Sequence, residues 1–218
     1  MMNGVKFVDK DGQEKHSITD WDLLMISKNI PDAEPKEIYL DIPYADGQLD
    51  ITEWTGSVNY NNRQLTFTFD IFQNSDEWWE LRKEISTYLN GRRMKITLDQ
   101  DQDFYYYGRC KIPNFSNITT VANIVVEANV EPYKYLQEET VIEIDMNGNY
   151  NGFLSNLFRP VVPEITTDAP IGITMNGISR QISAGTFKFV DFALGEGQNQ
   201  IDMSGTANVT IRYQQAVL

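Results

Sequence analysis

Histidine and cysteine are almost absent from this sequence, which contains one of each, His16 and Cys110. A single cysteine allows no intrachain disulfide, which fits a protein that folds in a reducing cytoplasm. One histidine and one cysteine also cannot supply the four nitrogen and sulfur ligands of a zinc site within one chain. The sequence therefore predicts neither a disulfide nor a zinc centre.

Long apolar runs and blocks of basic residues are missing as well. No run reaches the ~18 apolar residues that a membrane span needs, and residues 1–20 are too polar for a signal peptide. Eighteen Lys and Arg stand against 31 Asp and Glu, a formal charge of −13, and both halves are acidic. Because a phosphate backbone is bound through clustered cations, we expect no direct nucleic-acid binding.

Residues suited to catalysis are scarce. The only histidine, His16, lies in a polar segment with no nucleophile motif beside it, so we interpret it as a solvated loop histidine. Cys110 lies in an expected strand, where its cationic neighbours Arg109 and Lys111 point to the opposite face, which favours a buried structural cysteine. Paired carboxylates can serve a glycosidase, but among 31 acids the sequence selects no pair. We expect no enzyme.

One acidic run resembles a metal site. The alternating Asp residues of 99–103 match the first five positions of a calcium-binding loop. The sixth position, which requires Gly, is Phe104, and the twelfth, which requires Glu, is Cys110. A solvated hairpin turn fits better, so we expect no metal and no cofactor.

The first half of the chain, residues 1–133, has the pattern of a mainly β domain. Leu65 to Ile71 alternates apolar and polar residues, which is typical of a half-buried strand. We expect Ser57–Tyr60 to pair with it as a hairpin through an Asn61-Asn62 turn. Gly47 is expected to supply a positive φ in the turn that precedes Leu49.

One helix is predicted, at about residues 75–90. Asn74 or Ser75 can cap its start, and Asn90-Gly91 suits a left-handed end. The apolar residues recur at helical spacing and predict a buried stripe: Trp78, Leu81, Ile85, Tyr88 and Leu89.

The second half, residues 134–218, changes character. Short apolar segments alternate with Gly and Asn, which predicts about seven short strands and a β-sandwich. The expected strands are 140–145, 161–166, 171–175, 178–182, 186–192, 199–203 and 209–213.

Aromatic residues are dense in the first half. Trp78-Trp79 in a helix and Tyr105-Tyr106-Tyr107 in a strand each place large rings on more than one face. The rings either fill a two-layer core or form a subunit interface, where Trp, Tyr and Arg are favoured. The candidate interface residues are Trp54, Arg63, Trp79, Tyr106 and Arg109.

Five segments, in order, resemble the sequence motifs of one known protein family. Residues 42–53, Ile-Pro-Tyr-Ala-Asp-Gly-Gln-Leu-Asp-Ile-Thr-Glu, resemble the family's IPG-x-DG-x-LDLTE stretch, with Tyr44 in place of a common Gly. Residues 60–69 are similar to Y-x-NR-x-L-x-F-x-F. The helix resembles W-x6-I-x3-LHG, with Asn90 where His is usual. Residues 106–109 and 132–134 resemble YYxGR and PYK. With these five motifs in this order, the chain resembles the siphophage distal tail proteins.

This resemblance implies a fold and a role. It implies an α+β N-terminal domain that closes as a hexamer ring and a C-terminal galectin-like β-sandwich. The resemblance implies that this ring joins the tail tube to the tail-tip hub, serves as a baseplate scaffold in the virion tail, and needs no cofactor. The C-terminal domain anchors adsorption or receptor-binding proteins in some phages.

Three other classes remain open. A lectin-like module would bind glycans or adsorption proteins as a free chain. A tail-tube protein would also form rings but would stack them into tubes. A hydrolase would cleave glycans.

Overall fold

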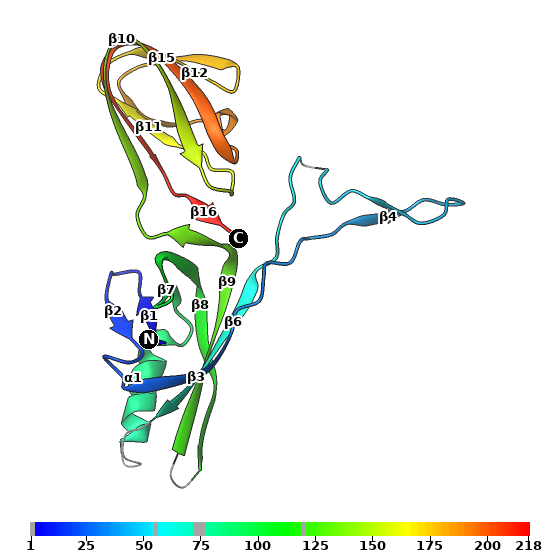
Figure 1. Ribbon diagram of the computed structural model, residues 1–218, viewed down its shortest axis with the longest axis vertical. Helices are drawn as coiled ribbons and strands as arrows, with labels where there is room; N and C mark the ends of the chain where they lie inside the picture. The colour runs from blue at the N-terminus through cyan, green and yellow to red at the C-terminus, as the bar shows by residue number, and fades with distance from the viewer. Residues whose placement is uncertain (1–2, 55, 72–76, 119–120) are drawn as a thin grey trace. The chain divides into compact units, whose positions relative to one another are not determined.

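The computed structural model describes residues 3–54, 56–71, 77–118 and 121–218 and is mainly β (Figure 1). The chain forms two compact units, Met1–Lys134 and Tyr135–Leu218. No helix in the described residues is long and apolar enough to cross a membrane.

The first unit is built on one large sheet with strand order β2-β1-β7-β8-β9-β6-β3. A separate two-stranded sheet, β4-β5, lies outside it. The elements are β1 (Val5–Val8), β2 (Glu14–His16), β3 (Leu23–Asn29), β4 (Tyr39–Asp41), β5 (Gln48–Asp50), β6 (Arg63–Ile71), α1 (Trp78–Leu89), β7 (Arg93–Leu98), β8 (Asp101–Ile118) and β9 (Val121–Leu136).

Helix α1 contributes its apolar stripe to the core of this unit, as its spacing predicts. The buried residues are Trp78, Leu81, Ile85, Tyr88 and Leu89. Gly91 follows the helix with φ +80°, which confirms the expected left-handed end. The expected caps Asn74 and Ser75 lie outside the described residues. Glu77 occupies the cap position in the structure and makes no side-chain cap hydrogen bond.

Strand β6 confirms the alternation seen in the sequence, because every second residue from Arg63 to Ile71 is buried. The expected hairpin with Ser57–Tyr60 is wrong. Strand β6 pairs instead with β3 on one side and β9 on the other. Those two strands satisfy both edges of β6 and exclude the nearer segment.

The second unit is a six-stranded sheet with strand order β13-β12-β15-β11-β14, and β10 pairs with β15. Its core gathers Ile, Met, Leu and Phe side chains of several strands, with Phe192 and Ile211 fully buried. The elements are β10 (Thr140–Asn156), β11 (Glu164–Thr167), β12 (Ile171–Met175), β13 (Ile178–Ile182), β14 (Gly185–Lys188), the 3-10 helix η1 (Val190–Phe192), β15 (Gly197–Tyr213) and β16 (Ala216–Val217).

Two strands of this unit are longer than the sequence predicts. Segments 199–203 and 209–213 are one strand, β15, and the segment that begins at Thr140 continues to Asn156. Gly148 lies opposite Gly205 in this ladder, and both have positive φ. The register continues through this glycine pair without a shift, so the two strands run past the point where the Gly- and Asn-rich sequence predicts a break.

Candidate assembly surface

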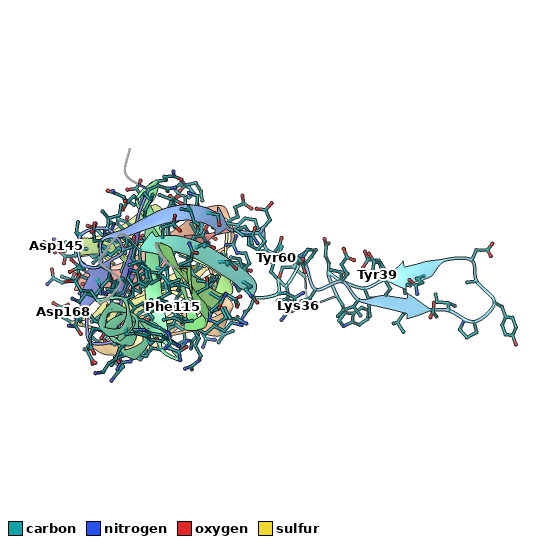
Figure 2. All side chains as sticks on the ribbon, turned by 90° about the horizontal axis from the view of Figure 1, so that it is seen from below. Lys36, Tyr39, Tyr60, Phe115, Asp145 and Asp168 are labelled. Atoms are coloured by element: carbon teal, nitrogen blue, oxygen red, sulfur yellow. The ribbon has the colours of Figure 1, made fainter. Side chains whose placement is uncertain are left out.

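The described residues of 36–59, which lie between β3 and β6 and include the hairpin β4–β5, extend away from the large sheet, and we call this segment the arm (Figure 2). Its base is closed by backbone pairing. The Lys36 amide donates to the Asn59 carbonyl at 2.7 Å, and Pro35 and Tyr60 form a bridge beside it. The arm is therefore an ordered extension of the first unit.

The outer half of the arm is the hairpin β4–β5, in which Leu40 lies opposite Leu49. Gly47 in its loop has φ +77°, as the sequence predicts. Tyr44 has φ +67° and a fully exposed ring. The left-handed region costs a non-glycine residue roughly 1–2 kcal/mol, so the tip holds a strained and exposed aromatic residue. Such strain is concentrated at functional sites.

Apolar exposure is concentrated on the arm. Among the described residues sixteen large hydrophobic side chains are exposed, and seven of them belong to this segment. Trp54 is the most exposed tryptophan of the described chain, at 83%. A concentration of this kind marks an interaction surface. The seven are Ile38, Tyr39, Leu40, Ile42, Tyr44, Leu49 and Trp54.

The arm is also acidic, since five carboxylates accompany one lysine between residues 36 and 59. Hydrogen bonds from the Thr52 hydroxyl and amide lower the pKa of Asp50, so this carboxylate is charged at neutral pH. The negative charge of Glu37 raises the pKa of the Tyr39 phenol, which stays neutral. A matching surface would therefore combine apolar side chains with cations.

A second aromatic patch lies on the first unit, at the outer side of α1. Trp79 is exposed, and its ring centroid is 5.5 Å from that of Phe115 on β8. The Arg82 guanidinium lies over both rings, at 5.5 and 5.4 Å. Trp and Arg together are enriched in the energetic centres of interfaces.

The structure does not gather the five candidate interface residues on one surface. Trp54 lies on the arm, Trp79 on α1, and Arg109 on β8, where its guanidinium donates to the Gly91 carbonyl. Arg63 and Tyr106 are buried, with the guanidinium 5.2 Å from the ring centroid. These two residues belong to the interior of the unit, and the other three are exposed.

Sequence reasoning missed the remaining apolar residues of the arm as a surface. Ile38, Leu40 and Ile42 alternate with Tyr39 and Asp41, which predicts a strand but not its exposure. The sequence does contain a signal of this exposure. The stretch lies between Pro35 and the polar Asn61-Asn62 pair, and it contains no long alternating strand that could pack over its apolar residues.

His16 differs from the solvated residue expected. It lies in β2, where its Nε2 is 2.9 Å from Asp99 Oδ1. The other Asp99 oxygen accepts the Gly4 amide at 2.8 Å, and a Cβ on Gly4 would lie 2.5 Å from the imidazole. Ser17 is buried and its hydroxyl accepts the Val5 amide. The histidine therefore ties β2 to the end of β7.

The other candidate chemical groups are buried or paired. Cys110 is buried, as the sequence predicts, and burial raises the pKa of its thiol to about 12, which disfavours the reactive thiolate. In the acidic run, Asp99 holds His16, and Asp101 accepts Lys134 Nζ at 2.6 Å. Within the described ranges no three His, Cys, Asp or Glu side chains gather as metal ligands.

Comparison with solved structures identifies the fold. The chain is similar to the SPP1 Dit (gp 19.1) protein, described as a paradigm of the hub adsorption apparatus in phages that infect Gram-positive bacteria. The TM-score is 0.70 and the identity 12%, over 98% of this chain and 99% of that chain. The chain therefore has the fold of a phage distal tail protein.

The other comparisons add little. A de novo designed double-stranded β-helix is 14% identical over 36% of this chain and 100% of its own, but its TM-score of 0.26 is too low to bear on the fold. No protein-family model and no curated protein matches the sequence.

Proposed function

We propose that the chain is a non-enzymatic structural protein of the tail of a long-tailed phage or prophage. Six copies close into the distal ring that joins the tail tube to the tail-tip hub and serves as a baseplate scaffold. The fold supports this role, because the similarity to SPP1 Dit extends over both units.

The observation that carries the proposal is the arm. An isolated two-stranded hairpin is at best marginally stable in water. The arm, which contains the hairpin β4–β5, exposes seven large apolar side chains. A second copy that packs against it would remove this surface from water. In a ring, each copy presents one surface to the next copy and a different surface to the previous copy, which is a head-to-tail interface. The arm of one copy therefore packs against a different surface of its neighbour.

The charge of the chain suits the lumen of such a ring. The formal charge is −13, so DNA that passes through the tail meets a like-charged protein and is not retained. In this proposal one face of the ring binds the tail-tube protein and the other the hub. The second unit holds receptor-binding or other adsorption proteins, in a virion assembled in the bacterial cytoplasm.

The first experiment is the solution mass of the full chain, by light scattering after gel filtration. One copy is 25.1 kDa, and a species of six times that mass is expected. Negative-stain microscopy should show single rings with a central hole. Long stacked tubes would instead identify a tail-tube protein, and a monomer at every soluble concentration would favour a free lectin-like module.

Two matched variants test the arm. Leu49→Asp places a charge on a half-exposed residue of the arm, and Val141→Asp does so at a half-exposed residue of β10. The first variant is expected to be monomeric and folded, and the second to keep the ring. Retention of the ring by Leu49→Asp would show that the arm does not close it.

A further inference from the structure

Trp79, Arg82 and Phe115 form an exposed surface at the outer side of α1, which we call the helix patch. Trp79 is 58% exposed, and Phe115 on β8 is only partly buried beside it. The arm is apolar and acidic, so the surface that receives it should combine apolar side chains with cations. The helix patch offers both kinds of group in one place.

Arg82 supplies the cation of the helix patch. Its guanidinium lies over the two aromatic rings, and it forms no ion pair with a carboxylate of the described residues. A guanidinium stacked on a ring keeps its N–H donors at its edge, so it can still pair with an incoming carboxylate. Lys83 adds a second cation, which is held only weakly, because its contact with Glu80 at 3.7 Å joins two exposed side chains.

The other exposed apolar side chains of the first unit fit the arm less well. Apart from the arm and Trp79, the described residues of this unit expose the large hydrophobic side chains of Leu24 and Ile26, both on β3. Leu24 lies opposite Asp70 on β6, whose carboxylate would repel an acidic arm. The helix patch is therefore the better match in charge as well as in aromatic content.

The arm points away from the helix patch of its own copy. It joins the large sheet at Arg63, the first residue of β6, which lies opposite Val130, whereas Ile71 at the other end of β6 lies opposite Ala122. Phe115 belongs to that second end, because it lies near the end of β8, the strand that leads into β9. Strand β6 separates the two ends by roughly 25–30 Å, and the arm extends to the side away from α1 (Figure 1). A contact between arm and patch therefore joins two copies.

The arm is long enough to make such a contact. From Lys36 to Tyr44 in the loop at its tip, an extended chain spans roughly 30 Å. A compact unit of the size of Met1–Lys134 has a radius of gyration of about 14 Å. The arm is therefore about as long as such a unit is wide, and it can lie along the neighbouring copy.

We infer that the arm of one copy docks on the helix patch of the next copy, and this docking rests on the proposed head-to-tail assembly. On the arm, Trp54 follows Glu53 directly, so a ring and a carboxylate lie close together. The patch offers the complementary pair, Trp79 and Arg82. The Glu53 carboxylate pairs with the Arg82 guanidinium, and the aromatic rings exclude water around this ion pair.

The first test reverses charges in the full chain and measures solution mass by light scattering over a dilution series. Arg82→Glu is expected to weaken association between copies about thirtyfold or more, which is typical of an interface hot spot. Adding Glu53→Arg to Arg82→Glu restores opposite charges and is expected to restore assembly. Lys10→Glu reverses an exposed cation outside the helix patch, in the β1–β2 turn, and should assemble as the wild type does.

The second test locates the contact. Ser57→Cys on the arm and Ser86→Cys, one helical turn after Arg82, are combined and treated with a short bifunctional thiol cross-linker. Covalent chains of up to six copies are expected on a denaturing gel. Cys110 is buried and should not react, so each single variant is a control that can yield no chain longer than two copies.

The outcomes separate this docking from the proposed ring. Rings that survive Arg82→Glu and give no cross-linked chains would overturn the docking and leave the ring standing. Stacked tubes that give the cross-linked chains would support the docking and overturn the single ring. A wild-type chain that stays monomeric at every soluble concentration would overturn both.

Discussion

Strand β6 and the arm adjoin in the sequence and use similar apolar residues, yet their side chains meet opposite environments. Leu65, Phe67 and Phe69 in β6 have no exposed area. Leu40 and Leu49 on the arm are half exposed. Strand β6 has a partner on each side and belongs to the core that α1 covers, whereas β4 and β5 pair only with each other.

The difference shows that burial depends on what lies beside and above a strand as much as on its composition. A two-stranded sheet has two edges and two faces in water. The large sheet gains a packed face from α1, and each interior strand gains two neighbours. The arm lacks both within the described chain, and in the proposed ring a second copy supplies them.

The largest loss of stability is expected from truncating a buried side chain of β6. Phe67→Ala removes a fully buried ring and should lower the free energy of unfolding by about 3–5 kcal/mol. Chemical denaturation of the monomer, followed by tryptophan fluorescence, measures the change.

The matched truncation on the arm is Trp54→Ala. Its ring is 83% exposed, so monomer stability should change by no more than about 0.5 kcal/mol, while the ring mass is lost. Equal destabilisation by the two variants would remove the distinction between arm and core.

A loss of stability smaller than that of Phe67→Ala is expected at α1, the helix that covers the sheet. The Tyr88 hydroxyl on α1 lies 3.0 Å from the Phe7 carbonyl and 2.7 Å from that of Gln13. Tyr88→Phe keeps the ring and leaves these acceptors short of a donor, at a cost of about 1–3 kcal/mol at neutral pH.

The same variant has a pH signature. Burial, then the negative charge of Asp9, raises the pKa of Tyr88 to about 12 from 10.0. The folded state thus holds a proton that the unfolded state releases, and this stabilisation is present below about pH 10 and lost between about pH 10 and 12. Stability curves over that range should fall less steeply for Tyr88→Phe than for the wild type; parallel curves would contradict the shift.

No loss of stability is expected at the junction of β6 and the arm. Arg63 is buried, its Nε and Nη2 have no hydrogen-bond partner, and Nη1 is 3.5 Å from the Pro31 carbonyl. Desolvation lowers the pKa of this guanidinium. Because a buried, poorly paired charge can be replaced by an apolar side chain at little cost, Arg63→Met should leave monomer stability unchanged or higher by about 1 kcal/mol.

Arg109→Met, on an exposed side chain of β8, is the control for Arg63→Met. Thermal unfolding of the two variants is compared under identical conditions. A loss of about 3 kcal/mol for Arg63→Met alone would show that the guanidinium holds the base of the arm in place.

Local patterns determined much of this protein. The spacing from Trp78 to Leu89 predicts α1 and its buried stripe, and the alternation from Leu65 to Ile71 predicts β6, because both periods follow from backbone geometry. Gly47 and Gly91 occupy the two positions where the sequence predicts a positive φ, and both residues adopt one. Cys110 is buried as its strand position predicts.

Only the tertiary structure decided which strands pair and which surfaces stay exposed. It joined β6 to β3 and β9, placed His16 against Asp99, and left the apolar residues of the arm in water. Register and pairing depend on contacts between residues far apart in the sequence, and a period of two specifies a strand without naming its neighbour. The sequence of an apolar strand therefore does not show whether the strand lies in a core or stays exposed until a partner binds it.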